Sequence, residues 1–330
     1  MDGILLAASF AVILAGALLF TNAVEWAGHR LEIGEGATGS LLAAVGTAMP
    51  ETLIPIVAII GAAEGAEEVA IGAIIGAPFL LATIAMALVG ISARLYRGRR
   101  AQGTRLAADA ETLDRDLLFF LIFFGAGAAI GLGVPDPVQI PLAVGFVLAY
   151  ATYVRRTLRS GGAVQELETI HPLYLDPTGG SAPPPATIAL QFLVGLGAMV
   201  GGAHLFVEEL LGVAEDIGVE PLVLSLVLAP LATELPEKAN SFFWVREGKD
   251  SLALGNITGA MVFQSTIPIA FGLALTEWDL DRHALLSAGL GLAGGAIAYW
   301  ALRLRGRFER LPIAAWSALF GAFLVYVAVA

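Results

Sequence analysis

Apolar residues in this chain are gathered into long runs that short polar connections separate. Each run is close to the roughly 20 residues that a helix needs to cross the hydrocarbon core of a bilayer. The first run follows Met1 and Asp2 with no positively charged stretch, so we interpret it as a membrane helix and not as a cleaved signal peptide. The pattern predicts ten membrane helices, at residues 3–27, 36–61, 69–93, 116–132, 138–154, 186–210, 222–245, 252–275, 284–304 and 312–329.

Positive charges fall on alternate connections between these segments. With ten spans, nearly all Arg and Lys residues of the connections lie on one face, which the positive-inside rule places in the cytoplasm. We therefore predict an integral plasma (cell) membrane protein with Arg-rich cytoplasmic loops and both termini outside. The residues on this face are Arg30, Arg94, Arg97, Arg99, Arg100, Arg105, Arg115, Arg155, Arg156, Arg159, Arg246, Lys249, Arg303, Arg305, Arg307 and Arg310.

The opposite face is acidic. One interpretation is that its carboxylates gather cations near an entrance. The other is that they only solvate short loops, where Asp and Glu are ordinary residues. The group includes Glu67, Glu68, Glu220, Glu277 and Asp281.

Composition agrees with a membrane bundle. Hydrophobic residues make up 57% of the 330, only 14% are charged, and mean hydropathy is +0.80. The formal net charge of -11 argues against nucleic-acid binding, which calls for basic patches. The chain has no cysteine, which excludes thiol chemistry.

Two stretches of the chain match one another. A Thr-x-x-Pro-Glu pattern and a later Gly- and Ala-rich stretch recur in the second and third segments of each half. Because each half has five segments, an odd number, the halves have opposite orientation, as in many secondary transporters. Chance similarity among small-residue helices is the alternative. The matching stretches are 46–51 with 70–77, and 232–237 with 253–260.

The predicted fold is therefore an all-α integral membrane protein, with ten transmembrane helices in two inverted-topology five-helix repeats. Residues 1–155 form the first repeat and 186–330 the second. The stretch 156–185, rich in Gly and Pro, is predicted to be a flexible cytoplasmic linker.

Three glutamates lie within otherwise apolar segments: Glu51, Glu234 and Glu237. A carboxylate at such depth costs several kcal/mol, about 2.5–3.5 on insertion scales. The neighbouring prolines break the helices and free carbonyls four residues earlier, and Thr47 and Thr233 add hydroxyls. These hard oxygen ligands suit Ca²⁺, Na⁺ or a proton. Alternatively, each Glu is protonated or hydrogen-bonded and only holds the bundle together.

Lys238 follows Glu237 directly and lies four residues after Glu234. An ammonium here can pair with either carboxylate and take the place of a bound cation, or it can face away from both. We predict pairing, because an unpaired Lys at this depth is costly. Pairing lowers the charge of the site from about -3 to -2, which suits one divalent ion or two protons.

At these residues the chain resembles the calcium/cation antiporter superfamily, which includes the sodium/calcium exchangers. That family has two inverted repeats, each with a Gly-Thr-Ser-x-Pro-Glu motif and a later Gly-Asn-x-x-Gly-Ser-Asn motif. The resemblance implies that Glu51 and Glu237 bind Ca²⁺ or Na⁺ in alternation, beside Thr47 and Thr233. It covers both repeats and the ten-span layout.

The chain departs from these motifs mainly in its first repeat. The motif serine is Ala48 in the first repeat and Glu234 in the second. The Asn is Ala73 in the first repeat but remains as Asn256, and the later Asn or Asp position holds Leu81 and Gln264. These losses argue against a family-like set of several Na⁺ sites and predict that the ion chemistry depends mostly on the second repeat.

We therefore expect a secondary active antiporter that exchanges Ca²⁺, or a related cation, for Na⁺ or H⁺ by alternating access at a midplane site. The alternatives are a passive cation channel and a proton-coupled exchanger for another cation. An enzyme is not expected, because the segments contain neither a pair of aspartates nor a His-Glu-x-x-His motif. Small cations and the bilayer are the expected partners, with no cofactor besides the transported ions. The candidate cation-binding residues are Glu51, Glu237, Glu234, Thr47, Thr233, Asn256 and Gln264, with Lys238 modulating the charge.

Overall fold

The computed structural model describes residues 2–30, 43–61, 63–159, 171–176 and 183–329, with side chains at all of these positions except 2, 28, 43–49, 136, 158–159, 235–237, 239 and 329. The described chain is all-helical. Within the described residues, each of the ten predicted apolar segments falls on one helix or on a run of consecutive helical elements. Their bounds are α1 (Asp2–Arg30), α3 (Ala43–Gly61), α4 (Ala66–Leu80), the π-helical turn η2 (Leu81–Ala85), α5 (Met86–Leu95), α6 (Ala110–Ile130), α7 (Asp136–Arg159), α8 (Pro185–Ile217), α9 (Pro221–Glu247), α10 (Asp250–Gln264), α11 (Ile267–Leu275), α12 (Arg282–Arg305) and α13 (Arg310–Val329).

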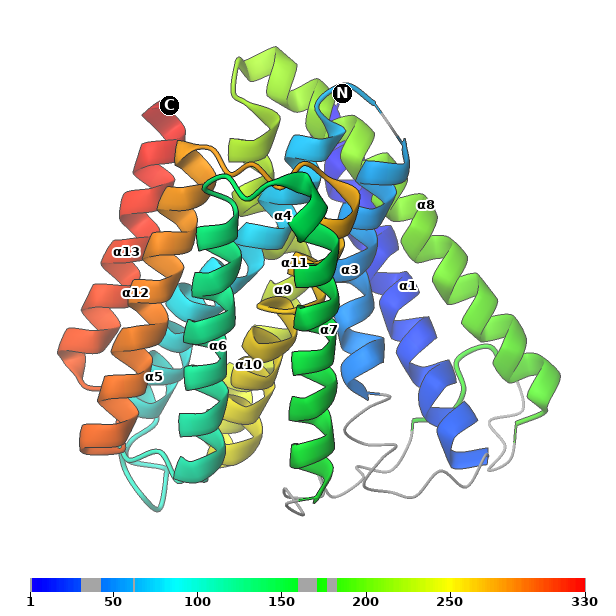
Figure 1. Ribbon diagram of the computed structural model, residues 1–330. Coiled ribbons are helices and arrows are strands. Elements are labelled where there is room, and N and C mark those ends of the chain that lie inside the picture. Colours follow the sequence, from blue (N-terminus) through cyan, green and yellow to red (C-terminus); the bar gives the residue numbers. More distant parts are fainter. Residues whose placement is uncertain (1, 31–42, 62, 160–170, 177–182, 330) are drawn as a thin grey trace.

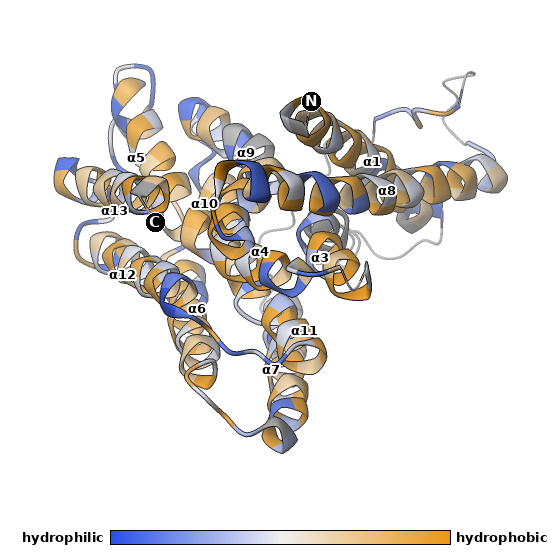
Figure 2. Ribbon diagram, turned by 90° about the horizontal axis from the view of Figure 1, so that it is seen from above, coloured by the Kyte–Doolittle hydropathy of each residue, from blue (hydrophilic) through white to orange (hydrophobic). Residues whose placement is uncertain are grey.

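The outer surface of the bundle is apolar, as a lipid-facing surface has to be. Leu18, Ile122, Leu148 and Leu193 are each more than half exposed, and apolar residues cover the outer helices seen from above (Figure 2). Among the described residues, seven helical stretches are long and apolar enough to cross a membrane. Shorter apolar stretches lie in α3 and α9. The count of ten spans and the domain boundaries stay predictions.

Two helices that begin the two sequence halves cross closely. α1 and α8 lie side by side at one edge of the bundle (Figures 1 and 2). A methyl group added at Gly16 of α1 would lie 2.9 Å from the Gly195 carbonyl oxygen of α8, and one added at Gly195 would lie 2.6 Å from the Phe20 nitrogen. Only glycine permits backbones to approach this closely.

The centre of the bundle is built on α4 and α9, which pack along one another with α3 and α10 beside them. α4 is nearly fully buried. The carbonyl of Leu226, four residues before Pro230, lies against Gly76 of α4. Pro230 has no N–H to donate to that carbonyl, which was therefore predicted to be free. In the structure, α4 covers it.

The prolines beside the glutamates do not break their helices, and this part of the prediction was wrong. α3 continues through Pro50 and Pro55, and α9 is one helix from Pro221 to Glu247. Neighbouring helices allow a membrane helix to tolerate proline without breaking. The irregular turns lie in the next helices: η2 follows α4, and residues 265–266 interrupt the helical run between α10 and α11.

Charged side chains and polar contacts tie the connections together at both ends of the bundle. At one end, the connection 96–109 is tied to the α12–α13 connection by the Leu106 N–H and the Gly306 carbonyl, and Arg100 forms a buried ion pair with Asp250 at 2.7 Å. At the other end, Glu67 accepts from the Glu277 N–H at 2.9 Å. Both termini lie at one end of the bundle (Figure 1). The predicted segregation of charge and the choice of cytoplasmic end stay predictions.

Part of the predicted linker is bound to the bundle. The side chains of Asn22 and Trp26 on α1 both donate to the His171 carbonyl at 3.0 Å. Gln191 of α8 accepts from the Leu175 N–H at 2.8 Å. Residues 171–176 therefore connect α1 to α8, which a flexible linker was not expected to do.

Candidate functional site

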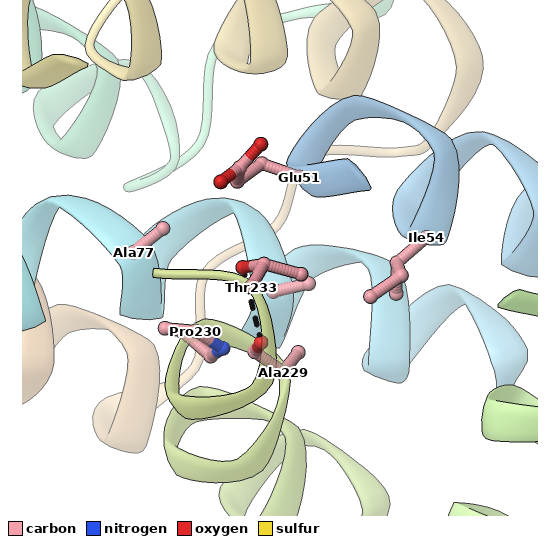
Figure 3. A pocket seen from close by; sticks show the side chains of 7 residues that line it. Glu51, Ile54, Ala77, Ala229, Pro230 and Thr233 are labelled. Carbon is pink, nitrogen blue, oxygen red and sulfur yellow. Dashed lines mark hydrogen bonds between the residues drawn. The ribbon is translucent and has the colours of Figure 1, made fainter. Parts of the chain in front are cut away.

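A small cavity lies where segments of the two sequence repeats meet. It is lined by Glu51 and Ile54 of α3, Ala73 and Ala77 of α4, and Ala229, Pro230 and Thr233 of α9 (Figure 3). The space open to the centre of a water-sized sphere is about 10 Å³, close to what one bound water needs. Because Ca²⁺ binds oxygen at 2.3–2.6 Å, a cavity of this size also admits a single small cation.

Glu51 supplies the carboxylate of this cavity. Its side chain comes from α3 and lies over α4, facing the same space as Thr233 (Figure 3). Glu51 is 8% exposed, so its charge is removed from water and requires compensation from a cation, a proton or another group of the protein. Alanines at positions 73, 77 and 229 leave room around it.

Thr233 supplies the matching oxygen from the second repeat. Its hydroxyl donates to the Ala229 carbonyl one turn earlier at 3.2 Å (Figure 3). With its proton directed there, the hydroxyl oxygen keeps lone pairs for a cation. The structure therefore brings Glu51 and Thr233 together, although they are far apart in the chain.

A second polar group lies on the same helix as Thr233. Lys238 pairs with Glu234, with Nζ and Oε2 3.1 Å apart and both side chains 1% exposed. Gln264, at the end of α10, donates its amide N–H to Oε1 of the same carboxylate. The predicted pairing of Lys238 is thus present, and Glu234 is its partner. Among the described residues, none of these three lines the cavity.

Of the other predicted site residues, Asn256 has a described side chain and does not line the cavity. Asn256 of α10 donates to the Ser241 hydroxyl of α9 at 3.3 Å and is half-buried. Ser241 was not predicted, although it lies one turn beyond Glu237 in the sequence. Glu237 and Thr47 lie within α9 and α3, and their side chains are outside the described residues.

The structure also places a buried aspartate against the second-repeat motif. Asp116 of α6 accepts from the Tyr153 hydroxyl at 2.8 Å and from the Thr258 hydroxyl at 2.9 Å, and it pairs with Arg115. Sequence reasoning missed this network. Its only signal was an Asp at the start of an apolar segment, where solvent exposure was the simpler expectation.

At the acidic end, a mixed cluster joins three elements. Nε2 of His283 lies 3.5 Å from Glu220 and 3.9 Å from Asp281, and Tyr326 bonds its other ring nitrogen. The Arg282 side chain donates to Nε2 at 3.1 Å, so a cation of the protein already faces these carboxylates. Both interpretations of the acidic face therefore stay open.

The donor set at the cavity is chemically specific. A carboxylate and a hydroxyl are hard oxygen ligands, which suit Ca²⁺, Na⁺ or a proton and do not favour soft metals. The site lies among helices that cross on glycine, so small movements of one helix against another can change access to it.

Comparison with known proteins identifies the family to which this chain belongs. The family model described as sodium/calcium exchanger protein matches residues 3–158 and 187–329. The putative antiporter CaxA of Alkalimonas amylolytica is 28% identical over 146 residues, 44% of this chain and 46% of that protein, so the match spans about half of this relative. Inner membrane protein YrbG of Escherichia coli (strain K12) is 24% identical over 74% of this chain and 71% of its own length.

Solved structures show the same fold. The crystal structure of the H⁺/Ca²⁺ exchanger CAX has a TM-score of 0.69 at 21% identity, covering 99% of this chain and 82% of that one. The sodium-calcium exchanger NCX_Mj has a TM-score of 0.57 at 18% identity, covering 97% and 95%. The likeness extends over almost the whole chain and agrees with the family match. This chain belongs to the sodium/calcium exchanger protein family, whose members are membrane ion exchangers and not enzymes.

Proposed function

We propose that this protein is a secondary active antiporter that exchanges Ca²⁺, or a related cation, for Na⁺ or H⁺. The transported ion binds at the cavity between α3, α4 and α9. Glu51 supplies charge and Thr233 a neutral oxygen, with Glu237 and Thr47 as the further ligands that the motifs suggest. The Glu51 carboxylate, buried in a cavity of single-ion size, is the observation that carries the proposal.

Alternating access follows from how the helices pack. Glycines bring the backbones of α1 and α8 together at Gly16 and Gly195. A movement of this helix pair against the helices around the cavity would expose the cavity to one side of the membrane and then to the other. The Arg-rich end is then the cytoplasmic end in a plasma membrane, with both termini outside.

Transport into proteoliposomes tests this function. We expect ⁴⁵Ca²⁺ to accumulate above its equilibrium level when an opposing Na⁺ or H⁺ gradient is imposed, and uptake to saturate. Glu51→Gln keeps the shape of the side chain and removes its charge, so uptake should fall to that of protein-free liposomes. Glu208→Gln, a carboxylate on the outside of α8 that is 60% exposed, is the matched control and should transport normally.

Two results would contradict the proposal. Ca²⁺ movement that only dissipates its own gradient would identify a passive channel. Absence of gradient-driven uptake with Ca²⁺, and its presence with another cation, would identify an exchanger with a different cargo.

A further inference from the structure

The cation that faces Glu234 is a side chain of the protein itself, the ammonium of Lys238. Lys238 and Glu234 lie one helical turn apart on α9, at 3.1 Å and 1% exposure. The second oxygen of Glu234 accepts from Gln264. Oε1 is therefore hydrogen-bonded by the chain itself, and the distance between Nζ and Oε2 leaves no space for an ion between them.

Stability alone does not explain a pair at this position. Removing two charges from water costs several kcal/mol per ion, and replacing a buried pair with apolar residues of similar volume is often neutral or stabilising. An exposed pair with the same spacing, Arg305 and Glu309, has no such cost. The buried pair therefore calls for a role other than stability.

An ammonium and an alkali ion carry the same single positive charge, but the ammonium of Lys238 cannot leave. We propose that Lys238 is a tethered cation, occupying permanently the position at Glu234 that a transported monovalent cation would otherwise fill. Glu234 then contributes no net charge to transport. Na⁺ does not bind at Glu234 and does not drive exchange.

This inference rests on the proposed function and deepens it by naming what sets the ion specificity. It predicts that the chain acquires a Na⁺ site when the ammonium is removed. Lys238→Met leaves Glu234 charged and unpaired, so a monovalent cation is drawn to it. Lys238→Arg keeps the positive charge. Glu234→Gln combined with Lys238→Met removes both charges and leaves no carboxylate at this position to attract Na⁺.

The experiment compares these variants with the wild-type chain, purified at full length. Binding of ²²Na⁺ is measured directly, and ⁴⁵Ca²⁺ uptake is measured with Na⁺ replaced by N-methylglucamine. We expect saturable ²²Na⁺ binding only in Lys238→Met, with Na⁺ changing Ca²⁺ uptake of that variant about tenfold, the effect of about 1.4 kcal/mol of added binding. Wild type, Lys238→Arg and the double variant should be insensitive to Na⁺.

Stability gives a second measurement that needs no transport. The unfolding temperature of Lys238→Met should rise when Na⁺ replaces choline, because a bound ion stabilises the folded state, and that of the wild type should not. Lys238→Gln serves in the same way where Lys238→Met does not fold.

Two findings would overturn the inference: saturable Na⁺ binding by the wild type, or equal insensitivity to Na⁺ in every variant. If the wild type moves no Ca²⁺ under any gradient, the proposed function fails, while the ²²Na⁺ comparison still decides the role of Lys238.

Discussion

Gly76 of α4 is the position where one added methyl group should most directly disturb the cavity. A Cβ built there would lie 2.8 Å from the carbonyl carbon of Leu226 and 2.9 Å from its Cα, and closer still to its carbonyl oxygen. Ordinary contacts of a Cβ begin at 3.4 Å. The distance from the added Cβ to the carbonyl carbon would have to grow by 0.6 Å, from 2.8 to 3.4 Å, and the distance to the carbonyl oxygen by more. Gly76→Ala would therefore separate α4 and α9 by about 1 Å.

This separation acts on the cavity itself. Ala77, the next residue of α4, and Ala229 and Pro230, one turn after Leu226 on α9, all line it. Overpacking of this kind typically costs about 1–3 kcal/mol of stability. A displacement of about 1 Å at a site that must hold its ligand in place can cost about 100-fold in rate. We therefore expect Gly76→Ala to fold with a lower unfolding temperature and to lose most of its transport.

The assay pairs the unfolding temperature in detergent with ⁴⁵Ca²⁺ uptake, normalised to reconstituted protein. Gly201→Ala is the matched control, because Gly201 lies on the exposed side of α8 with no described atom within 4 Å of an added Cβ. It should equal the wild type in both measurements. If Gly76→Ala matched this control, the tight contact between α4 and α9 would not be what shapes the cavity.

Two further substitutions test other parts of the structure. Thr233→Val removes the hydroxyl that faces Glu51 and should weaken apparent Ca²⁺ affinity about tenfold or more, because a charged ion loses one of its ligands. Thr233→Ser keeps a hydroxyl and should retain the wild-type affinity. Equal affinities of Thr233→Val and the wild type in an uptake titration would exclude Thr233 as a ligand. Asp250→Asn leaves Arg100 buried without its carboxylate, which should cost about 3 kcal/mol or more and expose the connection 96–109 to trypsin. Asp114→Asn breaks a more exposed pair with Arg303, and its free energy of unfolding should stay within about 1 kcal/mol of that of the wild type. Equal trypsin sensitivity of Asp250→Asn and Asp114→Asn would contradict this reasoning.

Local pattern predicted the helices and the meeting of the two repeats. Apolar runs place a helix reliably, because lipid leaves the backbone few other ways to satisfy its hydrogen bonds. The repeated Thr-x-x-Pro-Glu pattern predicted that residues from both halves share a site, and Glu51 and Thr233 do face one cavity. The spacing of four residues between Glu234 and Lys238 predicted their pairing, because such residues lie on the same face of a helix.

What the sequence could not predict depends on partners far away in the chain. Asn256 was expected at the cation, but it bonds Ser241, because the packing of α10 on α9 decides which way the amide faces. Arg100 was counted as a loop charge, yet it is buried against Asp250, 150 residues away. The prolines were expected to break their helices, since sequence does not show the neighbours that support a helix through a missing hydrogen bond.

The two halves differ most at one position, and the structure explains how the difference is compensated. Where the first repeat has Ala48, the second has Glu234, which adds a negative charge that the first half lacks. Lys238, one turn later, cancels this charge within the same helix. Without the lysine, Glu234 would be a buried carboxylate with no counterpart in the first repeat, and a charge left unpaired at such depth is costly. The need to compensate it gives a physical reason for the extra glutamate to be accompanied by a lysine.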